Sequence, residues 1–208
     1  MASLAAILAL ALGGCGSEAG AVDTPTVFPV SDMSAYHVDT EHRFQDVSML
    51  DFLDLISEPG FEGVFYFGFP GCPWCQAAVP VIAEAATASG VDVLYVSRAH
   101  VLREGDWADA DLAAAEWLDH QVGLEWLTDD DDVPTRPNIF VPFVVHIRDG
   151  AVVDFHRGTF EGHAHVGEGD TRHLPELTAG QHADLFARYQ TIFSGVGDGC
   201  SAQAMTCS

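Results

Sequence analysis

Apolar and polar residues recur with the periods of helices and strands from about residue 47 onward, and this pattern predicts an ordered series of elements. Leu50, Leu53 and Ile56 repeat at helical spacing and predict a helix from Met49 to about Ser57. Ser48, just before this segment, is a residue type that is favoured at a helix N-cap. We expect the apolar stripe of the helix to pack against the core.

The next segments alternate between strand and helix patterns. An apolar run from Val64 to Phe69 predicts a buried strand, an alanine-rich stretch from Pro73 to about Ala88 predicts a helix, and Val91 to Val96 predicts a second buried strand. A strand, a helix and a strand in this order form a β-α-β unit with parallel strands.

The second half of the chain predicts a helix, a hairpin and a final helix. Residues from Ala108 to Gln121 are helical by composition. Phe140 to Ile147 and Ala151 to Phe155 flank an Asp-Gly pair, which is typical of a tight turn between antiparallel strands. Thr178 and Gln181 fit a capping box, and the helix that they begin carries an apolar stripe.

Residues 72–75 read Cys-Pro-Trp-Cys and lie where the alanine-rich helix is predicted to begin. A helix N-terminus presents unpaired N–H groups and the positive end of a dipole, and both favour a thiolate over a thiol. The pKa of Cys72 should therefore lie below the free value of about 8.5, which makes Cys72 the attacking residue and Cys75 the resolving one. Pro73 suits the first helical position, and Trp74 offers an apolar face beside the sulfur.

A C-x-x-C pair can also be half of a zinc site or a structural disulfide. A zinc site needs two further ligands, and the sequence has no second C-x-x-C or H-x₃₋₅-H at finger spacing. The sequence therefore favours a redox-active Cys72–Cys75 disulfide, with no metal and no other cofactor.

This part of the chain resembles the thioredoxin superfamily. Pro80 stands eight positions after Cys72, where the family has a helix-kinking proline, and Val141-Pro142 resembles its cis-proline before a strand. The resemblance implies an α/β thioredoxin-like fold: a central mixed sheet with helices on both faces and, in this chain, a helical insertion before the cis-proline strand. It also implies that Trp74, Val141 and Pro142 shape the groove that holds the substrate.

The chain departs from the superfamily pattern at one position. Many members carry a buried Asp or Glu six residues before the first cysteine, where it helps to deprotonate the resolving thiol, whereas this chain has Tyr66. A phenol with a pKa near 10 is a poor base at neutral pH. Water and Tyr66 are therefore both candidates for accepting the proton of Cys75.

A closer resemblance is to the thioredoxin-like lipoproteins that are grouped with the bacteriocin-transport accessory proteins of bacteria. They carry a Phe-Tyr-x-Gly strand before C-P-x-C, here residues 65–68, and a His-x-Gly-Thr segment after the hairpin, here residues 156–159. The resemblance covers about Val47 to Tyr189.

The composition adds a strong charge imbalance. Eight basic residues, all of them arginine, stand against 31 acidic ones and give a formal net charge of −23. Such a surface repels nucleic acid and anionic lipid headgroups, so we expect no nucleic-acid partner. The charge is compatible with a high-salt habitat or with selection for solubility.

The N-terminus predicts export. Residues 1–14 form an apolar run of the length of a signal-peptide core, without a preceding Lys or Arg, and are too short to span a membrane. The run ends in Leu-Gly-Gly-Cys15, which resembles the lipobox of bacterial lipoproteins, and this resemblance implies that Cys15 is lipidated. A plain signal peptide is the alternative, and in either case the protein works outside the cytoplasm, anchored in the membrane by lipid or secreted.

Two further cysteines, Cys200 and Cys207, lie close together near the C-terminus. They would close a short disulfide loop in an oxidising compartment, and two free thiols are the alternative. We divide the chain accordingly into a signal peptide with lipobox (1–15), a tether and N-terminal extension (16–46), a thioredoxin-like domain (47–196) and a C-terminal tail (197–208).

Two clusters of metal-ligand residue types lie in the second half of the chain. The acidic run Asp129–Asp132 lacks the alternating spacing and closing Glu of an EF-hand, which favours a solvated loop over a calcium site. His163 and His165, with His156 and His173 near them in sequence, match no standard zinc or copper spacing, which favours structural or surface histidines.

These features together predict an extracytoplasmic thiol-disulfide oxidoreductase, acting as a reductase or isomerase on cysteine-containing proteins or peptides. A separate redox partner would supply or accept electrons. The alternative is a non-enzymatic lipoprotein that uses the same scaffold to bind a metal or a protein partner.

Overall fold

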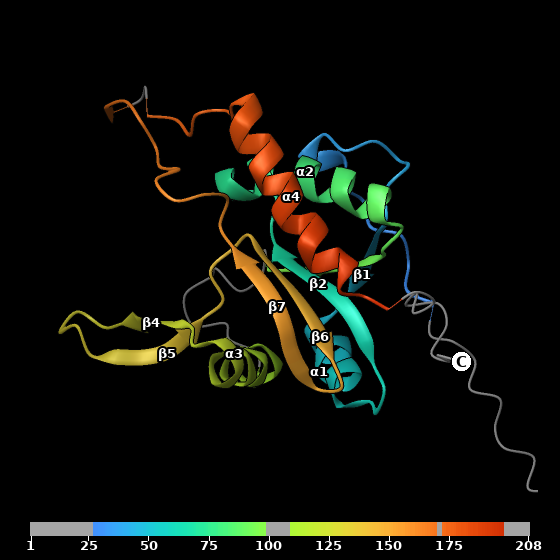
Figure 1. The fold of residues 1–208 in the computed structure, drawn as a ribbon. Helices are drawn as coiled ribbons and strands as arrows, with labels where there is room; N and C mark the ends of the chain where they lie inside the picture. The colour runs from blue at the N-terminus through green and yellow to red at the C-terminus, as the bar shows by residue number, and fades with distance from the viewer. Residues whose placement is uncertain (1–26, 99–108, 170–171, 198–208) are drawn as a thin grey trace, which may run out of the picture.

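The computed structural model describes residues 27–98, 109–169 and 172–197 (Figure 1). The candidate lipobox residue Cys15 and the tail cysteines Cys200 and Cys207 lie outside these residues. The predictions that concern them are therefore not addressed by the structure.

The fold is built on a five-stranded mixed sheet with the strand order β1-β3-β2-β6-β7. β1, β3 and β2 are parallel, whereas β6 pairs antiparallel with both β2 and β7. The strands are β1 (Phe44–Val47), β2 (Glu62–Gly68), β3 (Val93–Ser97), β6 (Phe143–Arg148) and β7 (Ala151–Arg157).

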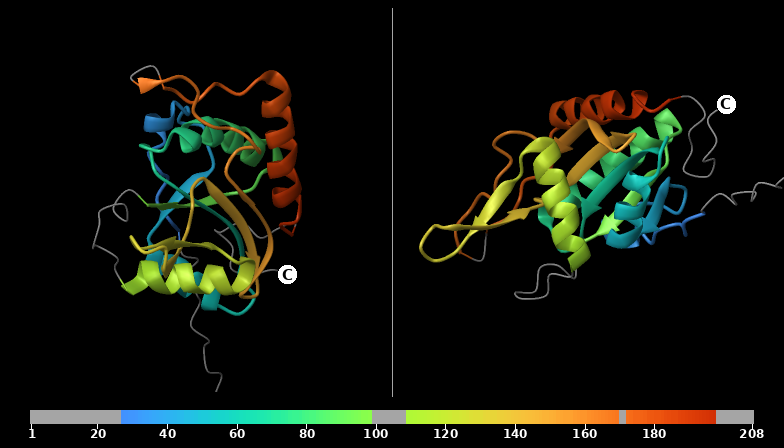
Figure 2. Two further views of the ribbon diagram at one scale, coloured as in Figure 1. Left: turned by 90° about the vertical axis from the view of Figure 1, so that its left-hand side faces the viewer. Right: turned by 90° about the horizontal axis from the view of Figure 1, so that it is seen from below.

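Helices cover both faces of this sheet (Figures 1 and 2). α2 (Pro73–Ser89) and α4 (Ala179–Ser194) lie on one face, and α1 (Met49–Ser57) and α3 (Asp109–Val122) lie on the other. The central strand β2 is apolar throughout because its side chains alternate between the two cores: Tyr66 joins the α2–α4 core, and Phe65 and Phe67 join the α1–α3 core. The predicted thioredoxin-like α/β architecture is confirmed.

The structure changes one prediction about α1. Its bounds are as predicted, and its capping box at Ser48 is present, but Leu50 is 64% exposed and does not belong to the core. The buried face is instead Met49, Phe52, Leu55 and Ile56. Phe52 decides the orientation because its ring packs edge-on against Phe65 and Phe67, and this turns Leu50 toward solvent.

Two elements before residue 48 join the folded unit. β1 pairs with β3, so the sheet begins at Phe44, within the segment expected to be an N-terminal extension. The short 3₁₀ helix η1 (Ser34–Tyr36) packs against α2 and places Tyr36, 1% exposed, in the core. The N-terminal extension therefore contributes to the core next to the active-site helix.

The insertion before β6 contains the predicted helix α3 and a hairpin that the sequence pattern did not predict. This hairpin, β4 (Glu125–Thr128) and β5 (Pro134–Asn138), projects from the body (Figures 1 and 2). The aspartate run lies at its turn, where the Asp129 carboxylate accepts the N–H groups of Asp131 and Val133. Asp129 thus stabilises the turn with its side chain.

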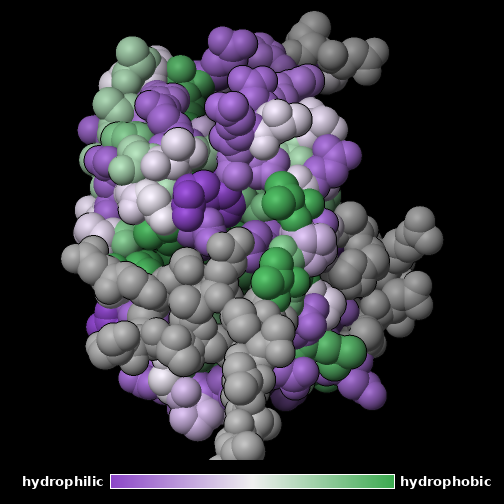
Figure 3. Space-filling model, turned by 90° about the vertical axis from the view of Figure 1, so that its right-hand side faces the viewer, coloured by the Kyte–Doolittle hydropathy of each residue, from purple (hydrophilic) through white to green (hydrophobic). Residues whose placement is uncertain are grey.

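The surface mixes hydrophilic and hydrophobic residues. On the face shown in Figure 3, hydrophobic residues stand singly or in small groups between hydrophilic ones. Within the described ranges, none of the helices is long and apolar enough to cross a membrane.

A buried arginine connects the insertion to the sheet. Arg98 follows β3, donates its backbone N–H to the Gly68 carbonyl, and is 2% exposed. Burial lowers the pKa of Arg98 to about 10, while the charge of Asp111 in α3, itself 1% exposed, acts in the opposite direction. The attraction between these two buried charges holds the first turn of α3 against the end of β3.

Removal of Asp111 should therefore destabilise the fold strongly. We expect Asp111→Ala to lower the free energy of unfolding by about 3–5 kcal/mol, because it leaves a buried guanidinium without its counter-charge. Urea unfolding checks this result. Asp109→Ala is the matched control, since Asp109 lies in the same turn but is exposed; equal effects of the two substitutions would contradict the argument.

Candidate active site

Cys72 is the N-cap residue of α2, directly after β2 and a short turn. Its sulfur accepts the backbone N–H of Cys75 at 3.4 Å, and its carbonyl accepts the N–H of Gln76 at 3.0 Å. Pro73 occupies the first helical turn, where a missing N–H costs no hydrogen bond. Both thiols are free, with Cys72 5% exposed and Cys75 fully buried.

The two thiols have opposite pKa shifts. A hydrogen bond from the Cys75 thiol, assisted by the backbone N–H groups of Cys75 and Trp74, lowers the pKa of Cys72 to about 7 against the effect of burial. The same hydrogen bond and burial raise the pKa of Cys75 well above its usual value. At neutral pH Cys72 is therefore partly ionised, with thiol and thiolate in comparable amounts, whereas Cys75 holds its proton.

The predicted cis-proline segment lies against the dithiol. The Val141–Pro142 bond is cis, and the Val141 carbonyl accepts a hydrogen bond from the Cys72 thiol at 3.7 Å. The Pro142 carbonyl accepts the N–H of Gly158 at 2.8 Å, which fixes this segment to the end of β7. Cys72, Val141 and Pro142, which lie about 70 residues apart in the sequence, are thus brought together.

Trp74 is anchored to the segment that follows β7. Its indole N–H donates to the His163 carbonyl at 2.7 Å, and its ring meets that of His165 edge-on with 4.8 Å between centroids. The sequence assigned Trp74 to the substrate groove, and the structure shows that its polar atom is already engaged. Trp74 therefore connects the dithiol motif to the segment that holds His163 and His165.

His163 holds this segment together from inside. One ring nitrogen lies 2.6 Å from the Thr159 hydroxyl, the other lies 2.8 Å from the Pro175 carbonyl, and the ring stacks on Phe160. His163 is 8% exposed, and both nitrogens are used within the protein. Among the described residues, no three His, Cys, Asp or Glu side chains form a group that could hold a metal ion.

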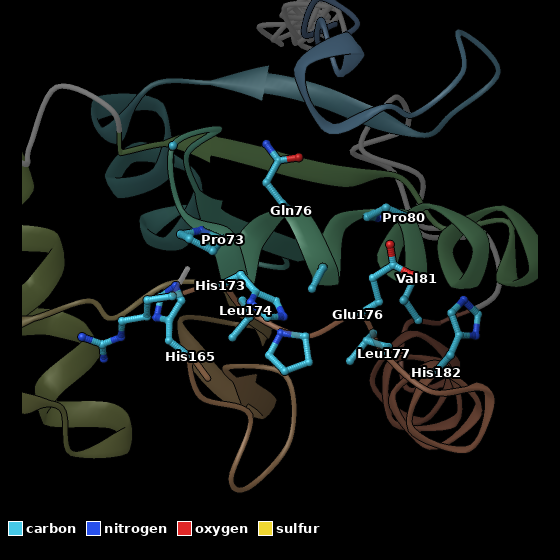
Figure 4. Close-up of a pocket in the computed structure, with 14 residues that line it drawn as sticks. Pro73, Gln76, Pro80, Val81, His165, His173, Leu174, Glu176, Leu177 and His182 are labelled. Atoms are coloured by element: carbon cyan, nitrogen blue, oxygen red, sulfur yellow. The ribbon is translucent and has the colours of Figure 1, made fainter. Parts of the chain in front are cut away.

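The segment forms one wall of a groove of about 590 Å³ beside the dithiol (Figure 4). Side chains of α2 face those of His165 and residues 172–177 across it, and α4 closes one end. The lining includes Pro73, Gln76 and Pro80 from α2, His165 and Leu174 from the segment, and His182 from α4. Pro80 lies inside α2, as the resemblance implied.

Tyr66 is fully buried in the core that contains Cys75. Burial, followed by the electrostatic effect of Cys75, raises the pKa of Tyr66 well above its usual value. A phenol that stays neutral is a hydrogen-bond donor and a poor proton acceptor. This pKa shift argues against Tyr66 as the base for Cys75.

The absence of a side chain at Gly68 leaves space for the Tyr66 side chain. A Cβ atom at position 68 would lie 2.0 Å from the Tyr66 hydroxyl oxygen, because the phenol ring extends along the strand over this residue. The Tyr-x-Gly spacing of β2 therefore has a steric cause: position 68 must lack a side chain for Tyr66 to adopt this orientation.

Sequence reasoning placed Tyr95 in a buried strand and Tyr189 on the apolar stripe of the last helix, but it did not connect Tyr36, Tyr95 and Tyr189 with the dithiol. They lie on η1, β3 and α4, and with Tyr66 they belong to the same buried cluster as Cys75. No spacing in the sequence connects them, because each comes from a different element. Their common residue type was the one available signal, since the chain has only four tyrosines.

Comparison with known proteins gives structural neighbours only. No protein-family model matches the sequence, and no curated protein matches it. A thioredoxin from Aeropyrum pernix is 18% identical, covering 54% of this chain and 73% of its own, with a TM-score of 0.33. A thioredoxin from Malassezia sympodialis is 15% identical, covering 74% and 96%, with a TM-score of 0.36. Thioredoxin O2 of Arabidopsis thaliana is 18% identical, covering 58% and 87%, with a TM-score of 0.35.

The lowered pKa of Cys72 predicts the pH dependence of its alkylation. The rate of reaction with iodoacetamide should rise with a midpoint at about pH 7 and fall to about a tenth of its plateau one unit below that midpoint. Peptide mass spectrometry separates Cys72 from the other cysteines. In Cys75→Ala the midpoint should move upward, because the largest stabilising hydrogen bond is lost; a wild-type midpoint at about 8.5 would contradict the assignment.

The Trp74 anchor predicts a local effect of its removal. Trp74→Phe keeps an aromatic ring but loses the hydrogen bond to His163, so we expect about 1 kcal/mol less stability and faster amide exchange in residues 159–166. Hydrogen-exchange mass spectrometry measures the second effect. Trp126→Phe, at a side chain that is 46% exposed on β4, serves as the control and should leave this exchange unchanged. Unchanged exchange in Trp74→Phe would argue against the anchor.

Proposed function

We propose that this protein is a thiol-disulfide oxidoreductase that acts on cysteine-containing proteins or peptides. The observation that carries the proposal is the free Cys72 thiol, whose pKa is lowered to about 7 at the N-terminus of α2. A thiolate at neutral pH is the nucleophile that disulfide exchange requires. Cys75, whose thiol hydrogen-bonds to this sulfur, is positioned to resolve the mixed disulfide between Cys72 and the substrate.

The reaction follows from these positions. The Cys72 thiolate attacks one sulfur of a substrate disulfide, a bond forms between the two sulfurs, and the second substrate sulfur leaves as a thiolate. Cys75 then attacks the Cys72 sulfur and releases the substrate in its reduced form. Two electrons pass to the substrate, the protein ends as a Cys72–Cys75 disulfide, and a dithiol reductant must restore it.

The environment of Cys72 supports a peptide substrate. In the reduced protein the Cys72 thiol donates to the Val141 carbonyl, and deprotonation of Cys72 frees this acceptor. An N–H group of an extended substrate segment can then take its place, next to Pro142. The groove along α2 gives the rest of the segment room to lie beside the reacting sulfur.

We further propose that the protein works outside the cytoplasm. The apolar run of residues 1–14 and the Leu-Gly-Gly-Cys15 sequence support export and lipidation, and the pair Cys200 and Cys207 supports an oxidising compartment. An accessory role in bacteriocin transport is supported only by the resemblance of residues 65–68 and 156–159 to the accessory lipoproteins.

The proposal predicts a reversible redox transition. Titration of the protein in glutathione buffers, followed by Trp fluorescence, should give a two-electron midpoint between about −270 and −180 mV. Trp74 reports the change because it lies between the two cysteines. Cys72→Ala should abolish the transition.

A trapping experiment tests the same proposal independently. Cys75→Ala should accumulate mixed disulfides between Cys72 and substrate proteins, since the resolving thiol is absent, and Cys72→Ala should not. Absence of both the transition and the adducts would reject the exchange activity. Stoichiometric copper or zinc that is lost in Cys72→Ala would instead identify a metal-binding protein, for which thiolates suit copper(I).

A further inference from the structure

All four tyrosines of the chain lie in the core beneath the dithiol. Tyr36, Tyr66, Tyr95 and Tyr189 are 1%, 0%, 5% and 0% exposed, and they belong to the cluster that contains Cys75. A buried hydroxyl loses its hydrogen bonds to water, so this arrangement is unfavourable unless the hydroxyls form hydrogen bonds with each other or with another group.

Two of the hydroxyls are satisfied within the cluster. The Tyr36 and Tyr95 oxygens lie 3.1 Å apart, and the Tyr95 hydroxyl donates to the Gly68 carbonyl at 3.4 Å. The Tyr66 ring stacks on the Tyr95 ring with 5.4 Å between centroids. This contact and the space above Gly68 fix the direction in which the Tyr66 hydroxyl extends.

The Tyr66 and Tyr189 hydroxyls, in contrast, have no hydrogen-bond partner of ordinary geometry within the part of the chain that the structure describes, and of these two the Tyr66 hydroxyl is the one that interacts with the Cys75 thiol. Its neighbour is Cys75, a neutral thiol that makes little demand on a donor. Interaction with Tyr66 nevertheless lowers the pKa of Cys75, in opposition to burial and to Cys72. The Tyr66 hydroxyl is thus in place as a donor before Cys75 becomes the thiolate that it would stabilise.

That charge arises in the second half of the exchange reaction. Cys75 is fully buried, and a thiolate that forms there has no water to solvate it. A neutral hydroxyl that is held beside the sulfur can supply the missing hydrogen bond without any reorganisation of the core.

We propose that Tyr66 is the internal hydrogen-bond donor to the Cys75 sulfur in the resolving step, and that stacking on the ring of Tyr95 holds it in position. The proposal rests on the proposed function. Cys75 gives its proton to water and attacks the Cys72 sulfur, the bond between Cys72 and the substrate sulfur breaks, and the substrate thiolate takes up a proton from solvent, so that no net proton is gained or lost. Tyr66 keeps its own proton throughout and acts as a donor, not as a base.

Tyr66→Phe tests the proposal cleanly. It keeps the ring and removes a buried hydroxyl that has no ordinary partner among the described residues, so the fold should be as stable as the wild type. Tyr95→Phe is the matched control: it removes a buried hydroxyl that makes two hydrogen bonds but points to Tyr36 and Gly68.

The aromatic disulfide dithiobisnitrobenzoate separates the two steps. Attack by Cys72 on this reagent releases one coloured thiolate, and resolution by Cys75 releases a second one. A variant with both Cys72 and Cys75 replaced by Ala gives the background from the other three cysteines. Stopped-flow absorbance follows both phases over a range of pH.

In Tyr66→Phe we expect an unchanged first phase and a second phase that is about ten- to a hundredfold slower at neutral pH, with its pH profile displaced upward. Tyr95→Phe should retain both phases within about twofold of the wild type. A second phase of wild-type rate in Tyr66→Phe, or equal slowing in Tyr95→Phe, would overturn the proposal. A wild type without a first phase would instead reject the proposed function itself.

Discussion

The site depends on the hydrogen bonds that the Cys72 sulfur accepts from the Cys75 thiol and from the Cys75 backbone N–H. They exist because β2 ends, the chain turns, and α2 begins with its unpaired N–H groups directed at residue 72 and with Cys75 in its first turn. The N-terminus of α2 favours an anion at residue 72 even though the net charge of the protein is strongly negative. The cis segment at Val141 then adds a carbonyl on the open side of the same sulfur, so that the nucleophile lies between a helix terminus and a strand terminus.

The sheet makes this arrangement possible by placing three distant segments at one edge. The dithiol follows β2, Val141 and Pro142 directly precede β6, and β7 leads into the segment that Trp74 and His163 hold in place. Beneath them the buried core contains polar groups, the tyrosine hydroxyls. A carboxyl group at position 66 would either carry a charge, which is unfavourable in this core, or take up a proton. A phenol stays neutral and keeps its hydroxyl as a hydrogen-bond donor.

The sequence predicted the parts of the structure that local signals determine. The Cys-Pro-Trp-Cys motif, Pro80, the Ser48 and Thr178 caps and the Asp-Gly turn each act within a few residues, and each was found where expected. Apart from the cis-proline segment at Cys72, which the resemblance implied, the parts that depend on distant contacts were missed. The orientation of α1 follows from Phe52 meeting β2, the pairing of β1 depends on β3, and the tyrosine cluster unites four elements. None of these contacts leaves a periodic signal in the chain.

The charge of the protein explains why the site is built from dipoles and hydroxyls. The chain has eight basic residues, all arginine, and the ion pairs among the described residues include Arg43 with Asp92, Arg148 with Glu62, and Arg188 with Asp154. Arg98 is buried near Asp111 at the root of the insertion. The interactions that lower the pKa of Cys72 are hydrogen bonds, which act at contact and are not screened by salt in the way that a distant charge is. A protein with a net charge of −23 can thus keep a thiolate at neutral pH, because the stabilising groups belong to the backbone and to the buried core.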